Sequence, residues 1–469
     1  MSSVVSERAT KILLICHDVV SENMAGPAIR YWEMARVLSK DFVVTLAAPG
    51  RPTLKNQCFE VRGYARSAPN SLASLVAAAD VVVAFGFVVH QFSFLQSIDK
   101  PLIVDVYDPF TLEHLEAYDD LPIFERMCMA SPDAGVLNRL FLAGDYFICA
   151  NERQRRFWLG VLTANGRINP TTYDEDKTLS RLIDVVPFGL PSVPPRHKRR
   201  VLKGVRQGIE RADKVILWGG GIWEWLDPIT LVRAVAKIAQ VRDDVKLFFL
   251  GKQHFDTVTV PETGICRRTF ELCRELGLLN TKVFFNSWTP YYERENYLLE
   301  ADVGVSLHPI HVEARFAFRT RVLDYIWAGL PVVTTSGDSM SETVQRRGLG
   351  KVVPGSDVDA LVAALVELLD APDLKKRLRP GFEKTADEYT WERVTMPLAN
   401  WCRAPQKAAD KGRCIRNHLL PTAAPLQPTP VWKLPWRAMR LLRSEGATRL
   451  AHEVRTYVRW KMADYQTRP

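Results

Sequence analysis

Short apolar runs alternate with amphipathic stretches along the first 190 residues. Ile29, Trp32 and Ala35 recur every three residues, which is the spacing of one face of an amphipathic helix, here expected over residues 28–39. The apolar runs are of strand length and lie at residues 11–16, 42–47, 80–84, 102–106, 146–150 and 183–186. Continuous apolar strands separated by helices predict a parallel sheet that is covered on both faces.

The same alternation starts again at residue 214. The expected strands are 214–218, 245–250, 282–285, 303–307 and 331–334, and the expected helices are 228–240, 267–278, 320–327 and 357–369. A repeated open α/β unit predicts two facing Rossmann-like domains. Ligands in such sheets bind beyond the carboxyl ends of the strands.

Breaks in this rhythm divide the chain into five parts. A length of 469 residues suits two domains and an appendage better than a single core. We expect an N-terminal Rossmann-like domain (1–190), a proline-rich and basic linker (191–213), a C-terminal Rossmann-like domain (214–403), a flexible Pro- and Ala-rich linker (404–431) and a basic amphipathic tail (432–469).

Charge and cysteine usage narrow the class of protein only in part. The net charge of +9 is compatible with nucleic acid, anionic lipid or phosphate-bearing ligands and does not choose among them. None of the eight cysteines forms a Cys-x-x-Cys pair, which favours reduced thiols in a cytoplasmic protein over a disulfide or zinc framework. No run of about 20 apolar residues indicates a membrane-spanning helix, and residues 1–10 lack the apolar core of a signal peptide.

The tail has its own pattern. Residues 432–462 carry eight Lys or Arg residues against Glu445 and Glu453, interleaved with aromatic and aliphatic residues at helical spacing. This composition predicts a helix lying on an anionic membrane surface, such as the inner face of the plasma membrane. The alternatives are a helix packed on the protein body or a disordered arm. We do not expect nucleic acid as a partner, because no recognised nucleic-acid module accompanies the tail.

Glycines follow the first strand of each predicted domain and mark two candidate phosphate sites. Gly26 precedes the first helix, and Gly220 and Gly221 follow the strand 214–218. Glycines let backbone N–H groups approach a ligand, and a helix N-terminus adds partial positive charge. The alternative is that these glycines only make the turn.

A third candidate site lies at the start of the helix expected over 320–327. Arg319 and Arg321 flank this start, where their guanidinium groups could bind a diphosphate, and Thr320 could cap the helix. Asp324 is one turn further along and could accept hydrogen bonds from ribose hydroxyls. The alternative is a solvated basic helix start with Asp324 paired to a neighbouring Arg.

The segment Arg321–Val333, which reads RVLDYIWAGLPVV, resembles the helix that carries the second Glu of the E-x7-E motif in retaining glycosyltransferases of family four. Residues 301–306 resemble the strand before it, Gly26 the glycine of the donor loop, and residues 185–190 the strand leading to the linker. The resemblance implies the GT-B fold, in which two Rossmann-like domains face each other across a central cleft. It also implies a nucleotide-sugar donor bound mainly by the C-terminal half, an acceptor bound mainly by the N-terminal half, and chemistry that needs neither a metal nor another cofactor.

The chain departs from this family at several positions. Asp324 stands where the family has Glu, and Phe316 replaces the first Glu, for which Glu313 is the nearest substitute. The family's Arg and Lys after the first strand of the C-terminal domain are missing, and Lys252 is a candidate replacement together with Arg319 and Arg321.

The N-terminal half offers several candidates for the group that orients or deprotonates the acceptor. Asp105 and Asp108 end a predicted strand where the family often places a His, and His90 and His114 are alternatives.

These features together predict a retaining, metal-independent glycosyltransferase. It would move a sugar from a nucleotide-diphosphate sugar to a glycan or polyprenyl-linked acceptor in bacterial surface polysaccharide or glycolipid synthesis. Two alternatives stay open: a sugar-nucleotide epimerase of GT-B shape, and a catalytically inactive glycosyltransferase-like partner in an assembly complex.

Overall fold

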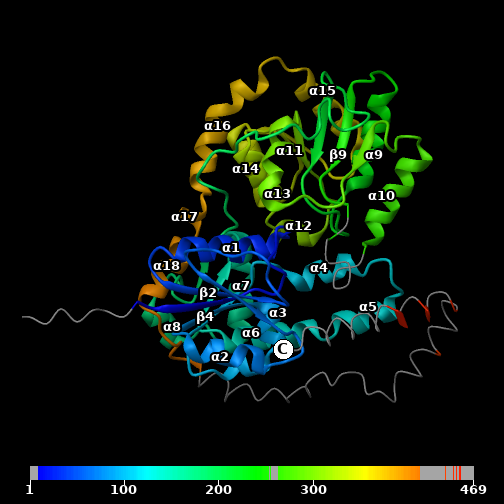
Figure 1. Cartoon of the computed structure of the whole chain (residues 1–469). Coiled ribbons are helices and arrows are strands. Elements are labelled where there is room, and N and C mark those ends of the chain that lie inside the picture. Colours follow the sequence, from blue (N-terminus) through cyan, green and yellow to red (C-terminus); the bar gives the residue numbers. More distant parts are fainter. Residues whose placement is uncertain are drawn as a thin grey trace, which may run out of the picture.

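The computed structural model describes residues 9–252, 254 and 262–411, and the six residues 439, 447, 450, 451, 454 and 455. Two α/β domains lie one above the other, each built around a parallel sheet (Figure 1). The strands of the first sheet follow the order β3-β2-β1-β4-β5-β6-β7, with β1 Lys11–Ile15, β2 Val43–Pro49, β3 Glu60–Tyr64, β4 Val81–Phe85, β5 Leu102–Asp105, β6 Tyr146–Cys149 and β7 Ile183–Val185. The second sheet follows the order β10-β9-β8-β11-β12-β13, with β8 Lys214–Trp218, β9 Val245–Phe249, β10 Val283–Phe285, β11 Val303–Ser306, β12 Val332–Thr335 and β13 Gly350–Val353.

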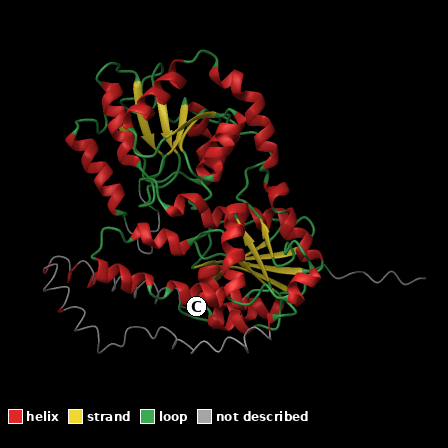
Figure 2. Cartoon of the chain, turned by 180° about the vertical axis from the view of Figure 1, so that it is seen from behind, coloured by secondary structure: helices red, strands yellow, loops and turns green. Residues whose placement is uncertain are grey.

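Helices cover both faces of each sheet (Figure 2). Those of the first domain are α1 Gly26–Leu38, α2 Asn70–Ala78, α3 Gly86–Gln91, the 3-10 turn η1 Ser93–Ser97, α4 Phe110–Ala117, α5 Ile123–Ala130, α6 Asp133–Ala143, α7 Glu152–Ala164 and α8 Pro170–Glu175. Those that follow are α9 Pro228–Ala239, α10 Gly264–Glu275, the 3-10 turn η2 Tyr291–Glu293, α11 Arg294–Glu300, α12 Val312–Phe316, α13 Thr320–Trp327, α14 Ser339–Arg347, α15 Val358–Asp370, α16 Leu374–Glu388, α17 Trp391–Val394 and α18 Met396–Arg403.

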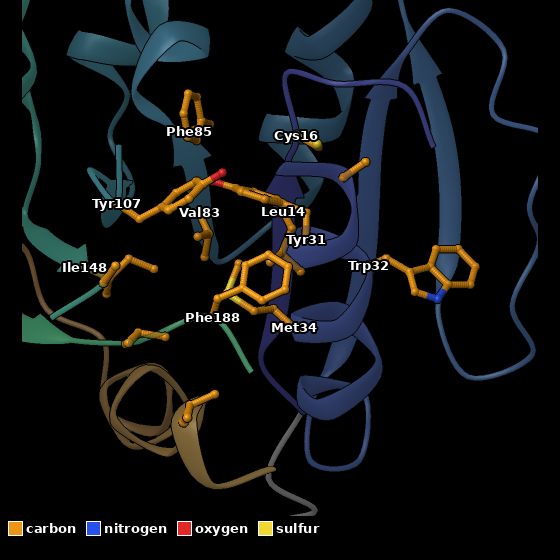
Figure 3. Packing of buried hydrophobic residues seen from close by; sticks show 14 of the residues in the cluster. Leu14, Cys16, Tyr31, Trp32, Met34, Val83, Phe85, Tyr107, Ile148 and Phe188 are labelled. Atoms are coloured by element: carbon orange, nitrogen blue, oxygen red, sulfur yellow. The ribbon is translucent and has the colours of Figure 1, made fainter. Parts of the chain in front are cut away.

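The central strands read as unbroken apolar runs because the sheet has no solvent-facing side there. Every residue of β4 is buried, and all of β1 except its first residue. Figure 3 shows Leu14 of β1 and Val83 of β4 packed with Tyr31 and Met34 of α1. Burial on both faces removes the alternation of a half-exposed strand, as expected for parallel sheets.

Each sheet reverses its strand order at one point, and these two points define the cleft. In the first sheet β1 lies between β2 and β4, and in the second β8 lies between β9 and β11. Loops that leave neighbouring strands to opposite sides open a crevice at their carboxyl ends. The predicted arrangement of two Rossmann-like units facing a central cleft is therefore confirmed.

Two strands have no counterpart among the predicted elements. β3 and β13 lie at the edges of their sheets, and most of their residues are exposed or half-buried. An edge strand with solvent on one side needs no continuous apolar run, so the pattern that identified the central strands does not detect it.

The end of the second predicted domain lies on the first one. Helix α16 leads the chain back, and α17 and α18 pack on the N-terminal domain (Figure 1). The ring of Trp391 lies 4.8 Å from Phe188, and Trp401 stacks on Tyr146 at 5.0 Å. The chain therefore returns to the first domain before residue 403, the expected end of the second domain. Amphipathic spacing shows that these helices are buried on one face but not which domain buries them.

Residues 404–411, expected to belong to a flexible linker, also lie against the first domain. Asp410 forms a buried ion pair with Arg167 at 2.9 Å. The rest of that linker and most of the predicted tail lie outside the described residues; the six tail residues that are described are helical. Within the described part of the chain, no helix has the length and apolarity that crossing a membrane requires.

We expect Trp391→Ala to lower the free energy of unfolding by about 3–5 kcal/mol, because it empties a fully buried site where the returning chain meets the first domain. Trp391→Phe keeps an aromatic ring at this site and should cost clearly less. Urea denaturation of both variants measures the difference. Equal stability of Trp391→Ala and the unmodified chain would contradict this role of the ring.

Candidate functional site

A cavity of about 520 Å³ lies between the two domains at the carboxyl ends of the central strands. The first domain contributes the loop after β1, the start of α1, helix α3 and the segment after β5, whereas the second contributes the loop after β8 and the segment from α12 to α13. Six of the predicted site residues line it: Gly26, Asp108, Glu313, Arg319, Thr320 and Arg321.

Arg321 lines this cavity and forms no ion pair with an acidic side chain among the described residues. Its Nη2 donates a hydrogen bond to the carbonyl oxygen of Gly221 at 3.1 Å, and its guanidinium lies over the Trp218 ring at 4.6 Å. The Nη1 atom is buried and has no hydrogen-bond partner there. Burial lowers the pKa of Arg321 to about 10, which leaves the group charged at neutral pH. A half-buried cation with an unpaired guanidinium N–H and no carboxylate partner has unused capacity for an anionic ligand.

The start of α13 lies beside Arg321. Arg319 occupies the N-cap position and makes no side-chain capping bond, so Thr320 is the first helical residue and not the cap expected from the sequence. The first N–H groups of a helix lack partners within the helix, and they carry its partial positive charge. Two sources of positive potential therefore meet at this wall of the cavity.

Arg319 does not add a third source, because Glu313 neutralises it. Its Nη2 and Nη1 lie 2.6 and 3.1 Å from the two carboxylate oxygens of Glu313, and both side chains are almost fully buried. Glu313 precedes Arg319 by six residues, and the short helix α12 brings the two together. Glu313 thus lines the cavity with its carboxylate held in place by Arg319.

The residue at the position of the missing Glu, Phe316, is tied to the first domain. Its ring lies 4.8 Å from Phe157 of α7, and its carbonyl accepts a hydrogen bond from Gln154 at 2.9 Å. The same Gln154 amide donates to the carbonyl of Tyr107 at 2.6 Å. This single side chain joins the end of β5 to the α12–α13 segment across the domain boundary.

Carboxyl groups line the opposite wall of the cavity. Burial, reinforced by the nearby Asp105 carboxylate, raises the pKa of Asp108 to about 7. Burial also raises the pKa of Glu113 well above its ordinary value. Asp108 therefore changes its charge near neutral pH, as a group that exchanges a proton with a substrate hydroxyl would need to do.

Asp105, the last residue of β5 and the second carboxylate expected to contact the acceptor, does not line the cavity. Its two carboxylate oxygens accept hydrogen bonds from Nε and Nη2 of Arg30 at 2.7 and 3.1 Å, and neither side chain is exposed. Arg30 also donates to the carbonyl of Pro187 at 3.0 Å. Asp105 therefore belongs to a buried ion pair that fixes α1 to β5. The sequence does not show whether the last residue of a central strand points into the cleft or into the core.

The other predicted residues also lie outside the lining of the cavity. Asp324 forms an ion pair with Arg294 at 3.0 Å, and Lys252 lies over the Phe270 ring at 4.1 Å and near Glu262 at 3.5 Å. Gly220 adopts a positive φ of 88° that its turn requires, and the adjacent Gly221 positions the carbonyl that Arg321 contacts. The alternatives His90 and His114 do not line the cavity either. The binding or catalytic role of every candidate stays a prediction.

Several lining residues escaped the sequence analysis. His17 stacks on Phe85 at 4.0 Å, and burial lowers its pKa to about 3, so it is neutral. Arg66 lines the cavity next to it but follows the edge strand β3, which the apolar pattern does not reveal. Glu113 was detectable in principle, because it lies in the first turn of the helix that follows the Asp108–Pro109 strand end.

Within the described residues, no group of three or more His, Cys, Asp or Glu side chains is arranged to hold a metal ion.

Residues 213–371 match the family model described as "Glycosyl transferases group 1". A curated relative is D-inositol 3-phosphate glycosyltransferase from Thermobispora bispora, 25% identical over 249 residues. That match covers 51% of this chain and 56% of the relative, so the chain spans only about half of the relative's length.

Solved structures extend the similarity of fold over both domains. Sucrose-phosphate synthase from Thermosynechococcus elongatus superposes with a TM-score of 0.60 at 15% identity, over 84% of this chain and 98% of that one. HepE of Anabaena in complex with UDP-glucose gives 0.58 at 15%, over 84% and 99%. WaaG, a glycosyltransferase involved in lipopolysaccharide biosynthesis, gives 0.57 at 16%, over 84% and 100%. The resemblance to GT-B glycosyltransferases expected from the sequence is confirmed.

We expect Asp105→Asn to destabilise the fold by about 3–5 kcal/mol, because Arg30 would keep its buried charge without a countercharge. Chemical denaturation at pH 7 checks this value. Asp108→Asn serves as the comparison, since its carboxyl has no ion pair to lose. A loss below about 1 kcal/mol for Asp105→Asn would show that Arg30 is compensated in another way.

The stability of the unmodified chain should fall between pH 4 and 7 through Asp108. The pKa of its carboxyl is raised to about 7 in the folded protein, against about 4 in the unfolded chain, so the folded state binds the proton more tightly. The contribution is thus complete below about pH 4 and is lost as the pH rises towards 7. Asp108→Asn removes this loss, whereas the exposed Asp174→Asn should not. Denaturation curves at pH 5, 6, 7 and 8 test the difference, and parallel pH profiles for all three proteins would contradict it.

Proposed function

We propose that this chain, which has the GT-B fold, is a glycosyltransferase that transfers a sugar from a nucleotide-diphosphate sugar to a glycan or polyprenyl-linked acceptor, with retention of anomeric configuration and without a metal ion. The observation that carries the proposal is Arg321 in the first turn of α13, a half-buried cation in the cleft whose Nη1 atom is buried and which has no acidic partner in the described residues.

The donor diphosphate binds at this wall in the proposal. Guanidinium groups and helix N-termini both serve as donors to phosphates in proteins, and Thr320 and Arg321, the first two residues of α13, line the cavity here. They stabilise the negative charge that grows on the departing diphosphate, so they act on the transition state more than on the ground state. This cationic wall supports chemistry without a metal, because it supplies the charge that a metal ion would otherwise provide.

The ring systems of the cleft give the rest of the donor a surface. Trp223 and Trp225 line the cavity and stack at 5.9 Å, next to the turn that carries Gly221. Such a flat apolar surface suits a nucleobase or a sugar ring. HepE with bound UDP-glucose has the same overall fold, which supports a nucleotide sugar as the donor class.

Asp108 is the group that we assign to the acceptor. It lines the wall opposite Arg321, and its pKa of about 7 lets it orient or deprotonate a hydroxyl at neutral pH. Glu313, held by Arg319, takes the place of the first Glu of the motif and contacts the donor sugar. A retaining reaction requires the acceptor to attack from the side on which the diphosphate leaves. The family-four motif at residues 321–333 supports this stereochemistry.

The biological setting follows from the acceptor class. We place the chain in bacterial polysaccharide or glycolipid synthesis at the inner face of the plasma membrane, where the basic residues of 432–462 would meet anionic lipid. WaaG, which shares the fold, is involved in lipopolysaccharide biosynthesis, and this supports the setting.

One observation favours a second candidate function, a catalytically inactive partner in an assembly complex. Phe316 occupies the position of the sugar-binding Glu, and its carbonyl is fixed to the first domain by Gln154. Such a protein would bind a nucleotide without turning over a nucleotide sugar, whether or not an acceptor is present.

A nucleoside diphosphate should raise the melting temperature of the unmodified chain, because a ligand that binds only the folded state stabilises it. Arg321→Ala should weaken binding about 10- to 100-fold, the loss of one charge-assisted contact. Arg315→Ala, which alters an exposed arginine of α12 outside the cavity lining, is the matched control. Thermal-shift assays with UDP, GDP and ADP measure the effect.

The absence of any shift with all three nucleotides would refute the donor site. Incubation with a nucleotide sugar in the absence of an acceptor distinguishes a transferase from a sugar-nucleotide epimerase. An epimerase converts the sugar nucleotide under these conditions, whereas the proposed transferase requires the acceptor.

A further inference from the structure

Helix α5 exposes apolar side chains at the edge of the first domain. None of its eight residues is buried, and Ile123 and Met127, one helical turn apart, are 72% and 64% exposed. Met129 of the same helix and Leu115 of α4 are also exposed. We call these four residues the α5 surface. Figures 1 and 2 both show α5 reaching outward below α4, away from the second domain. Contiguous exposed apolar side chains of this size mark an interaction surface.

The electrostatic surroundings of the α5 surface are acidic. Residues 115–130 contain four carboxylates, of which Asp119 pairs with Arg126 at 3.0 Å and Asp120 with Arg268 of α10 at 2.6 Å, whereas Glu116 and Glu125 form no ion pair among the described residues. Asp119 and Asp120 are exposed. A partner must therefore combine apolar side chains with positive charge. An anionic lipid surface has the wrong sign.

The C-terminal segment of the same chain has both properties. Residues 432–462 carry eight basic residues against two acidic ones, and their aromatic and aliphatic residues recur at helical spacing. The described residues Met439, Leu450 and Val454 of this segment are helical. An amphipathic helix of this kind can lay its apolar face on an exposed apolar surface.

The connection between the two is long enough. Asp410 is fixed to the first domain by its buried ion pair with Arg167. The 20 residues of 412–431 can span at most about 70 Å. A segment tethered in this way is present at an effective concentration in the millimolar range, so even a weak contact would be occupied.

We propose that residues 432–462 dock as an amphipathic helix on the α5 surface, with their basic side chains facing the carboxylates of residues 116–125. This contact is independent of the proposed transferase activity. It keeps the apolar face of α5 away from water, and it competes with an anionic membrane for the same basic residues.

Cys128 on α5 allows a direct test in the full chain. Cys128 is exposed, and Cys58, which is exposed just before β3, is an internal control. In a Cys414→Ser background we expect the reaction of Cys128 with a thiol reagent to be slowed by the docked segment. The variant Arg437→Glu, Arg440→Glu and Arg443→Glu should accelerate labelling of Cys128 about tenfold and leave Cys58 unchanged. Salt at about 0.5 M should act in the same direction, because it screens the attraction.

Three controls keep the test decisive. The three substitutions lie outside both domains, so an unchanged melting temperature confirms the fold, and unchanged nucleotide binding separates this test from that of the donor site. Equal labelling of Cys128 in both proteins would overturn the proposal. Protection that rises with protein concentration would overturn it in favour of a second copy of the chain.

Anionic vesicles of phosphatidylglycerol and phosphatidylcholine test the remaining possible occupant of the α5 surface, which is a lipid membrane. If vesicles accelerate labelling of Cys128 in the unmodified chain, the segment has left α5 for the lipid, and the proposal is supported. If vesicles slow labelling of Cys128 in the charge-reversed variant, α5 itself contacts lipid, and the proposal is overturned.

Discussion

The arrangement of this molecule depends on one constraint, the reversal of strand order beside β1 and beside β8. At each reversal the loops leave the sheet in opposite directions, and the backbone groups at the strand ends stay free for a ligand. Because the two domains face each other at these ends, the cavity draws its walls from both. A ligand that spans it must contact the start of α1 and the start of α13 at the same time.

Charge in and around this cavity is divided between pairs that build the protein and groups left for a ligand. Arg30 with Asp105 and Arg319 with Glu313 are buried and mutually compensated, so their function is to hold geometry. Arg321 has no such partner in the described part of the chain, and burial lowers its pKa to about 10 without removing its charge. Arg321 is half-buried, and its buried Nη1 has no hydrogen-bond partner there, an arrangement that costs folding free energy and that an anionic ligand would compensate.

The two domains are joined by contacts that also set the geometry of the site. Gln154 connects the carbonyls of Tyr107 and Phe316, and Trp391 anchors the returning chain behind the first domain. Any change in the relative position of the domains would move Asp108 relative to the α12–α13 segment. Phe316, at the position where the sequence resemblance leads us to expect a Glu, has a structural role, because its ring packs on Phe157.

The sequence by itself determined the two parallel sheets, the order of the two domains along the chain and the approximate place of the cavity between them, since buried strands and glycine turns leave local patterns at Lys11–Ile15 and Gly219–Gly221. It did not determine which charges are free. Arg319 and Arg321 are two residues apart and alike in sequence, yet only the tertiary structure places Glu313 against the first and leaves the second over Trp218. The sequence likewise does not show that Asp105 is paired with Arg30 whereas Asp108 lines the cavity. It also does not show that α17 returns to the first domain. Pairing and packing partners are set by contacts between distant segments, and such contacts leave no periodic signal in the chain.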